Sequence, residues 1–302
     1  ANLPHATFRD LGFAARPDGL FDVYSAGGLG GSPKFGVKVA EAVAPDQILY
    51  YIKAMWLTFR AYGNYENRAK ARTRYMQDAL GGPEAYAAAY REKLDEVYRT
   101  EDLTLTGVAA PVLAKTGAPD AALAAEPRVT AQKQPGLYAV AWHPVGGMPD
   151  PDVFCAVSDA LQGIDAAELR LCPDEGAYLV NLTAGEARRL LALTENDTAH
   201  SVFETSVACI GAATCQVGLR DSQALLAECV AAVRAAGLPD GALPQIHISG
   251  CPSSCGTHQI GALGFRGAAR VVDGKPQPAF TLFAGGCDRQ GGEAMGREVG
   301  IM

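Results

Sequence analysis

The sequence predicts an α+β protein with more than one domain. Apolar residues recur at helical spacing over residues 46–63 and 83–98. Over residues 133–199 the expected elements follow the order β-α-β-β-α, which is typical of a small mixed unit. The tripeptide Ala-Gly-Gly ends a strand-like stretch at residues 26–28 and again at 284–286. This repetition indicates an internally duplicated architecture.

The composition excludes several classes of protein. The chain has 302 residues, of which 48% are hydrophobic and 20% charged, enough for two or three cores. A net charge of -7 argues against nucleic acid as a partner. No run of 18 apolar residues is present, so we expect no membrane span. The first residues lack the features of a signal peptide, and we expect a cytoplasmic protein with reduced thiols.

The first region, residues 1–107, is expected to begin with a strand over residues 21–25. A helix then follows Pro45, with Asp46 as N-cap and Gly63 at its end. Its inner face is predicted to carry Ile48, Ile52, Met55, Trp56 and Phe59. Two further helices are predicted over residues 67–80 and 83–98.

Residues 108–132 are rich in alanine and proline without a clear period, and they predict a linker. In the unit that follows, residues 133–199, strands are expected at 137–142, 168–172 and 177–182. Asp152 is expected to cap the first helix of this unit, and Thr183 and Glu186 form a capping box at the start of the second.

The last region, residues 200–302, carries most of the chemistry. We expect a helix from about Gln216 to Ala236, ended by Gly237, with Leu219 on its inner side. A strand over residues 245–249 then leads directly into Gly250 and Cys251.

Four of the eight cysteines form two closely spaced pairs. Cys209 and Cys215 are separated by five residues, and Cys251 and Cys255 by three. Four thiolates from two loops rich in small residues suit a [4Fe–4S] cluster. A zinc site, disulfides and four unrelated buried thiols remain as alternatives. We expect the other cysteines to serve in packing; they are Cys155, Cys172, Cys229 and Cys287.

The cysteine loops also carry a family resemblance. Cys209-x5-Cys215, followed by Gly-Cys-Pro-Ser-Ser-Cys-Gly at residues 250–256, resembles the signature of the ferredoxin-dependent assimilatory nitrite and sulfite reductases. Similar motifs lie at residues 6–13, 26–30, 63–64, 258–261 and 263–265. The resemblance covers nearly the whole chain.

The resemblance implies a cofactor pair and a reaction. Cys209, Cys215, Cys251 and Cys255 would ligate a [4Fe–4S] cluster, and Cys255 would also bridge to the iron of sirohaem as the catalytic cysteine. Reduced ferredoxin would supply six electrons, one at a time, for nitrite to ammonium or sulfite to sulfide. The opening Cys209-Ile210-Gly211 looks slightly more like that of nitrite reductases.

The same resemblance implies a duplicated nitrite/sulfite reductase architecture. Residues 1–107 would be the C-terminal part of a first sirohaem-binding repeat, and residues 133–199 a ferredoxin-like half domain. Residues 200–302 would form the α/β domain for sirohaem and the cluster. Family members are longer, so an N-terminal half of the same enzyme would act as partner to this chain.

The basic run before residue 75 has two interpretations. Arg68 and Arg72, like Lys70 and Arg74, are four residues apart and would form two stripes on a helix. A solvated face is the ordinary interpretation, whereas the resemblance favours Arg68 and Arg72 as partners of the sirohaem carboxylates.

Two other features have a structural and a functional interpretation. The glycines of residues 27–31 lack the context of a dinucleotide fingerprint, so we interpret them as a tight turn beside a cofactor or as a plain loop. His247 and His258 lie near the second cysteine pair and could donate protons, but hydrogen-bonding or solvent-facing roles are commoner.

Three functional hypotheses therefore stand. The first is a sirohaem and iron–sulfur oxidoreductase, the second is an iron–sulfur electron-transfer module without haem, and the third is a zinc-stabilised interaction domain. Visible absorption together with iron, sulfide and zinc contents would separate them.

Overall fold

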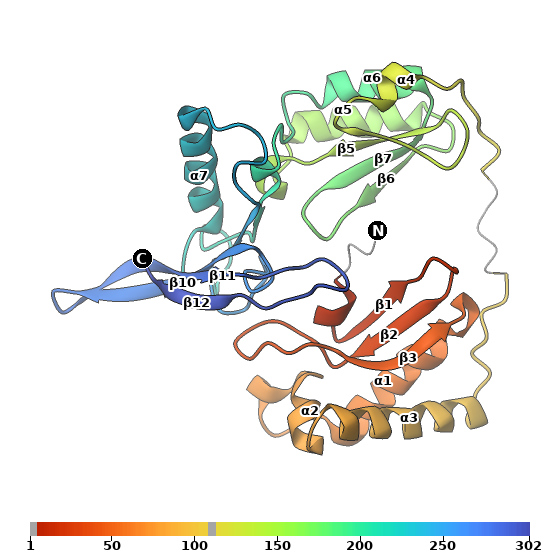
Figure 1. The fold of residues 1–302 in the computed structure, drawn as a ribbon, viewed down its shortest axis with the longest axis vertical. Coiled ribbons are helices and arrows are strands. Elements are labelled where there is room, and N and C mark those ends of the chain that lie inside the picture. Colours follow the sequence, from red (N-terminus) through yellow and green to blue (C-terminus); the bar gives the residue numbers. More distant parts are fainter. Residues whose placement is uncertain (1–4, 108–112) are drawn as a thin grey trace. The chain divides into compact units, whose positions relative to one another are not determined.

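The computed structural model describes residues 5–107 and 113–302 (Figure 1). The chain divides into two compact units, Ala1–Ala110 with Asp288–Glu293 and Pro111–Cys287 with Ala294–Met302. Among the described residues, no helix has the length and apolar character needed to cross a membrane.

The first unit packs helices against an antiparallel sheet. The sheet has the order β1-β2-β3, formed by Leu11–Ala15, Phe21–Ser25 and Val37–Val43. The helices are α1 (Ile48–Tyr62), α2 (Tyr75–Leu80) and α3 (Pro83–Thr100). Val23, Ala54, Tyr86, Tyr90 and Val97 are fully inaccessible at the centre of this core.

The predicted inner face of α1 is confirmed for Met55 and Phe59, which pack against the core, and is wrong for Ile52 and Trp56. The helix buries Tyr50, Tyr51, Ala54 and Thr58, whereas Ile52 and Trp56 are 42% and 47% exposed. Small side chains such as Ala54 allow close approach of neighbouring elements, and the Tyr50 hydroxyl finds a polar partner 3.1 Å away in Asp102. Asp46 is not the N-cap, because Pro45–Gln47 form a short 3₁₀ turn that precedes the helix.

The helix expected over residues 67–80 forms only in its second half. The Asn67 side chain accepts a hydrogen bond of 3.0 Å from the Ala69 N–H and stabilises a 3₁₀ turn over Arg68–Lys70. An Asn side chain that bonds the local backbone competes with helix formation in this way. The regular helix, α2, begins at Tyr75, so the two predicted basic stripes do not form.

The second unit contains the predicted β-α-β-β-α order. Its four-stranded sheet has the order β4-β5-β7-β6. The strands are Val129–Ala131, Tyr138–Trp142, Glu168–Leu171 and Ala177–Leu182, numbered β4 to β7 along the chain, and the helices are α5 (Pro151–Gln162) and α6 (Ala184–Leu193). The capping box of Thr183 and Glu186 is confirmed. Asp150, not Asp152, caps α5, because Pro151 occupies the first helical position.

The segment expected to be a linker, residues 108–132, contains regular structure. Its residues 108–112 lie outside the described part of the chain. Asp120 caps a short helix, α4 (Ala121–Ala124), and β4 pairs with β5 at the edge of the sheet. Short alanine-rich and three-residue elements carry too little periodicity to be detected in the sequence.

The sheet of this unit offers a matched test of its core. Leu179 on β7 is fully buried, whereas Leu171 on the neighbouring β6 is 79% exposed. Leu179→Ala is expected to lower the free energy of unfolding by about 2–5 kcal/mol, because it leaves a cavity. Leu171→Ala should change it by less than about 0.5 kcal/mol. Urea unfolding of both variants checks this, and equal effects would contradict the assigned core.

A five-stranded sheet completes the second unit. Its order is β12-β11-β10-β9-β8. In chain order β8 to β12 are Val207–Ala208, Ile246–Ser249, Leu263–Val272, Lys275–Ala284 and Arg297–Ile301. The helix α7 (Ser222–Ala236) starts later than predicted, because Asp221 caps it, and Leu219 is 51% exposed instead of inward. Gly237 ends α7 in the left-handed conformation, as predicted.

The predicted duplication appears in matching backbone contacts of the β1–β3 and β10–β12 meanders. Each meander holds three corresponding interactions in its own unit. In the first, Ala26 N donates to Asp10 O in one meander and Gly285 N donates to Ala262 O in the other. In the second, Gly36 N donates to Thr7 O and Gly296 N donates to Gln259 O. The third is an isolated bridge, between Gly28 and Lys34 and between Cys287 and Ala294. Ala26 thus corresponds to Gly285, one residue away from the match that the Ala-Gly-Gly tripeptides suggest.

Candidate functional site: a cavity lined by four cysteines

The two cysteine pairs follow neighbouring strands. Cys209 comes directly after β8, and Cys251 comes two residues after the end of β9. These strands are parallel, so both chains leave the sheet at the same edge. This topology brings together two loops that lie about 40 residues apart in the sequence.

All four cysteines line one cavity of about 280 Å³. The other lining residues are mostly small, as the loops' composition predicts: Gly211, Gly218, Ser249, Gly250 and Ser253, together with Glu175, Ile210 and Val217. Cys251 is buried, Cys209 and Cys215 are half-buried, and Cys255 is exposed. Of the four thiols, Cys255 is therefore the one that a second group could reach most directly from outside.

The four thiols influence one another electrostatically. Burial raises the pKa of Cys255, and the thiols of Cys209, Cys251 and Cys215 raise it further. Four thiolates in one cavity therefore repel one another unless a cationic group lies between them. Iron bound by thiolates supplies that positive charge.

The loop geometry provides hydrogen bonds to sulfur. The Gly250 N–H donates to Cys209 Sγ at 3.1 Å, and the Ser222 hydroxyl, which donates to the Cys209 carbonyl oxygen at 2.6 Å, lies 3.2 Å from the same sulfur. Such donors commonly surround the sulfur ligands of iron–sulfur clusters and tune their potential. The donor set and the cavity thus fit a cluster held by four cysteines.

Ligation itself stays a prediction. In the part of the chain that the structure describes, no group of three or more His, Cys, Asp or Glu side chains is arranged to hold a metal ion. The shared cavity, the mutual effect on the pKa of Cys255 and the N–H donor at Cys209 are the observations that support the four-cysteine set.

Gly256 allows the second cysteine loop to pack closely against the backbone of β9. A Cβ atom at this position would lie 1.9 Å from the carbonyl oxygen of Ile248. Gly256→Ala is expected to displace the loop that carries Cys255 and to lower the iron content of the purified protein by more than about 10-fold, as disruption around a metal site does. Gly185→Ala is the control, because nothing lies within 4 Å of its added Cβ. Equal iron contents in both variants would contradict this role.

Glu175 is a cavity residue that the sequence does not single out, since it appears there only as part of a turn. Its Oε2 accepts the Ala208 N–H at 3.0 Å. Burial raises the pKa of Glu175 to about 7, and the neighbouring carboxylate of Asp174 adds to the shift, against the opposing effect of the Ala208 N–H.

The two histidines near the cysteine loops are both buried. The Nδ1 atom of His247 lies 2.8 Å from the Thr257 hydroxyl oxygen, which agrees with the hydrogen-bonding interpretation. His258 is fully inaccessible, and burial, with Arg266 and His247, lowers its pKa to about 3. It is therefore neutral near pH 7 and has no imidazolium proton to donate.

The remaining cysteines do not line this cavity. Cys229, a residue of α7, packs against the core of this unit, as predicted. Cys155 is exposed, so the expectation that it packs in a core is wrong. Cys172 and Cys287 are half-buried.

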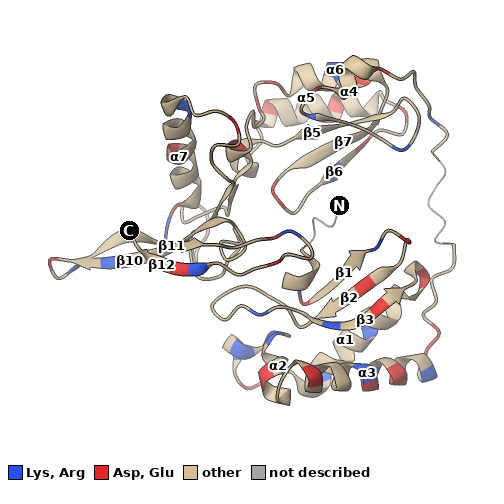
Figure 2. Cartoon of the chain, viewed as in Figure 1, with Lys and Arg blue, Asp and Glu red and all other residues tan. Residues whose placement is uncertain are grey.

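The basic run of the first unit separates into different environments. Arg68 is exposed, and Arg72 donates to the Asp10 carboxylate at 2.8 Å. Lys and Arg gather on the segment that precedes α2 (Figure 2). Contact of Arg68 and Arg72 with sirohaem stays a prediction, and Arg72 would first have to leave Asp10.

Arg74 differs from the other basic residues of the run. It is 7% exposed, its Nε has no hydrogen-bond partner among the described residues, and no acidic side chain there forms an ion pair with it. Its guanidinium lies against the glycine turn: a Cβ on Gly30 would be 3.1 Å from Nη2. The sequence includes Arg74 in the run but gives no sign of its burial.

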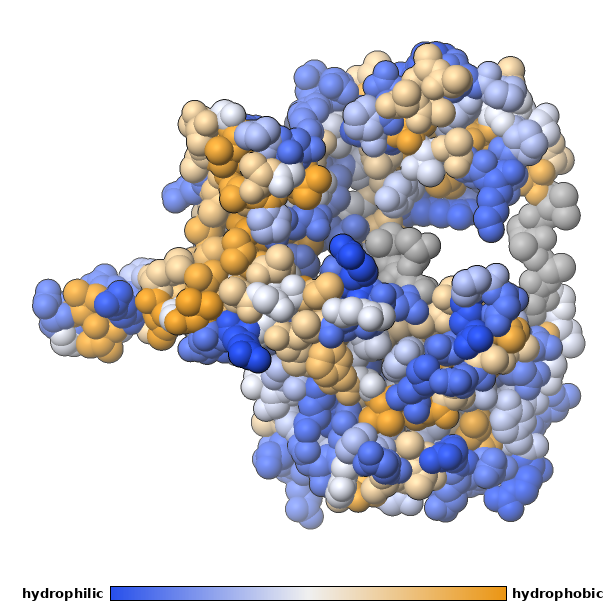
Figure 3. All heavy atoms as spheres, viewed as in Figure 1, coloured by the Kyte–Doolittle hydropathy of each residue, from blue (hydrophilic) through white to orange (hydrophobic). Residues whose placement is uncertain are grey.

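The first cysteine loop and the residues that directly follow it carry exposed apolar side chains. Ile210, Val217 and Leu219 are 50%, 69% and 51% exposed. Figure 3 shows further apolar residues on the visible surface over α7 and the β10–β11 hairpin.

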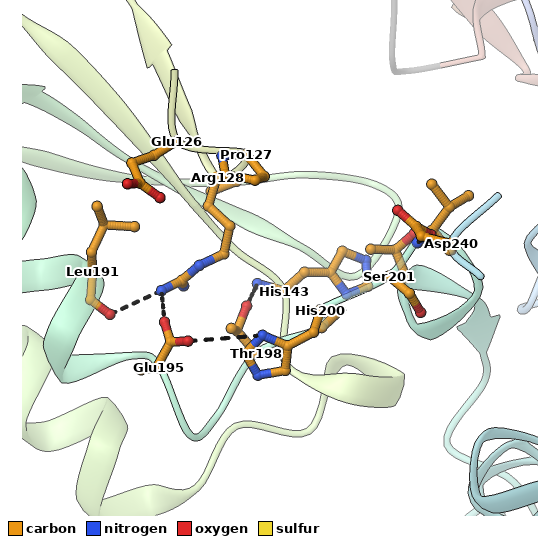
Figure 4. A pocket seen from close by; sticks show the side chains of 14 residues that line it. Glu126, Pro127, Arg128, His143, Leu191, Glu195, Thr198, His200, Ser201 and Asp240 are labelled. Atoms are coloured by element: carbon orange, nitrogen blue, oxygen red, sulfur yellow. Dashed lines mark hydrogen bonds and ion pairs between the residues drawn. The ribbon is translucent and has the colours of Figure 1, made fainter. Parts of the chain in front are cut away.

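A second cavity of the same unit, of about 510 Å³, contains no cysteine (Figure 4). Its Arg128 is fully engaged, with the Glu195 carboxylate at 2.8 Å and the Leu191 carbonyl oxygen at 2.9 Å. Arg128 therefore already has a carboxylate partner in Glu195, whereas the thiols of the cysteine cavity raise the pKa of Cys255.

Comparisons with known proteins point to one family. Residues 1–97 match the model of the nitrite and sulphite reductase 4Fe-4S domain. The ferredoxin–nitrite reductase of Synechococcus elongatus is 28% identical over 94% of this chain and 54% of its own length. The sulfite reductase [ferredoxin] 1 of Mycolicibacterium paratuberculosis is 24% identical over 88% of this chain and 47% of its own length.

A solved structure shares the fold. The NirA protein of Mycobacterium tuberculosis superimposes with a TM-score of 0.76 at 23% identity, over 99% of this chain and 54% of its own. The chain thus spans about half the length of the proteins it matches. The chain is thus similar to the ferredoxin-dependent nitrite and sulfite reductases.

Proposed function

We propose that this chain forms the cluster-bearing part of a cytoplasmic nitrite or sulfite reductase that takes electrons from reduced ferredoxin. One observation carries the proposal: two loops from neighbouring parallel strands line a single cavity with four cysteines. The names of the relatives support both anions as substrates. Cys209-Ile210-Gly211 gives a slight preference for nitrite.

Within this proposal the chain's own residues hold two groups. Cys209, Cys215, Cys251 and Cys255 would bind a [4Fe–4S] cluster, and Cys255, the exposed one of the four, would also meet the sirohaem iron. Arg74, buried without an acidic partner among the described residues, is a better candidate for a sirohaem carboxylate than Arg68 or Arg72. When bound, the two groups supply one-electron transfers that together reduce the anion by six electrons.

The test combines composition with turnover. The purified holoprotein should contain iron and labile sulfide and show a Soret band with a red chlorin-like band. With reduced ferredoxin it should form ammonium from nitrite or sulfide from sulfite, and the faster anion identifies the substrate. Iron and sulfide without tetrapyrrole would instead indicate an electron-transfer module, and zinc alone an interaction domain.

A further inference from the structure

Glu175 reaches the cysteine cavity from another part of the second unit. It lies in the turn between β6 and β7 of the half domain, outside the cysteine loops. Its backbone has the left-handed φ of 69°, which is uncommon for a residue with a side chain. A Cβ atom on Gly147 would lie 2.8 Å from Glu175 Cβ, so this glycine leaves the space that Glu175 occupies.

The Glu175 carboxyl group accepts a hydrogen bond from the backbone N–H of Ala208, the residue that precedes Cys209. Ala208 belongs to β8, the edge strand of its sheet, so N–H groups on the outer side of β8 have no strand partner. Glu175 Oε2 accepts the Ala208 N–H at 3.0 Å. Gln223 Nε2 donates to the Ala208 carbonyl oxygen at 2.9 Å, so both polar groups of Ala208 are held by side chains.

A packing role does not account for a carboxyl group here. Among the described residues Glu175 forms no ion pair with a cation, and the nearest charge that acts on it is the like charge of Asp174. Burying a carboxyl group without a cation is costly, and an apolar side chain would fill the same space at lower cost. What Glu175 provides is the acceptor for Ala208.

We infer that Glu175 is the positioning residue of the first cysteine loop: it holds the Ala208 N–H and thereby fixes Cys209 against the half domain. This inference rests on the proposed function for the identity of the bound group. Glutamine offers a carbonyl oxygen at nearly the same place and should replace glutamate. Alanine should not, because it leaves the N–H without its acceptor.

The experiment compares wild type, Glu175→Gln and Glu175→Ala in the holoprotein, with Glu168→Ala on β6 as the exposed control. Iron release to a chelator should be about 10–100-fold faster in Glu175→Ala. Glu175→Gln and Glu168→Ala should stay within about threefold of wild type, and thermal unfolding reports whether each variant is folded. The inference would be overturned if Glu175→Ala released iron at the wild-type rate, or if Glu175→Ala and Glu175→Gln released it equally fast.

A second measurement separates this inference from the proposed function. After removal of any bound metal, the chain is treated with an alkylating reagent, and modification of Cys209 is followed by mass spectrometry. Glu175→Ala should speed this reaction and Glu175→Gln should not. If wild type never contains iron and sulfide, the proposed function fails, and the alkylation rates alone then decide the positioning role. Equal rates in all variants would refute it.

Discussion

Cys255→Ser in the holoprotein is expected to lower reduction of nitrite and sulfite by more than about 100-fold, beyond the loss typical of residues that only support a metal ligand. Cys255 is the exposed thiol of the four that line the cavity. In the proposed function it has two tasks, ligation of the cluster and contact with sirohaem. Serine is a much weaker ligand than cysteine for the iron of a [4Fe–4S] cluster, because the thiolate is the group that binds this iron.

The readout is formation of ammonium and sulfide with reduced ferredoxin, alongside the iron and haem contents. Cys229→Ser is the matched control, because this thiol lies on α7, packs against the core and does not line the cavity. It should retain activity within about threefold, as conservative changes away from a site do. Activity retained by Cys255→Ser would refute the double role, and an equal loss in Cys229→Ser would show a general sensitivity to cysteine replacement.

The sequence predicts those elements whose signals are local. The capping box of Thr183 and Glu186 and the left-handed Gly237 lie within a few residues of the helix ends that they define. The order of strands and helices in residues 133–199 follows from such signals. The common edge at which both cysteine pairs emerge depends instead on the parallel pairing of β8 with β9, which joins residues about 40 positions apart.

Tertiary contacts decided what the sequence could not. The inner face of α1 is set by Ala54 and Thr58, which lie against other elements, and not by the larger Ile52 and Trp56. A local contact, by contrast, shortened the helix expected over residues 67–80, since the Asn67 side chain bonds its own turn. Glu175 lies in what the sequence presents as an ordinary turn, and only the fold brings it beside Ala208.

The buried guanidinium of Arg74 leads to the second large effect. Arg74→Met keeps much of the aliphatic stem and removes the charge, and it is expected to reduce the sirohaem content of the purified protein by about 10–100-fold. This corresponds to loss of a charge-assisted hydrogen bond worth about 1.5–3 kcal/mol. The cysteine cavity belongs to the other unit, so the iron and sulfide of the cluster should remain.

The matched controls are Arg68→Met and Arg72→Met, which remove the same charge from exposed positions nearby. If a buried guanidinium without an acidic partner is what binds a carboxylate, both controls should retain sirohaem within about threefold, because exposed charges contribute little. Arg74→Lys should be intermediate, since lysine keeps the charge but not the two-pronged geometry. Loss of sirohaem in Arg68→Met or Arg72→Met, with normal content in Arg74→Met, would instead favour the pair that the sequence suggested. In that case Arg72 must release the Asp10 carboxylate, which lies 2.8 Å away in this structure, and bind a sirohaem carboxylate in its place.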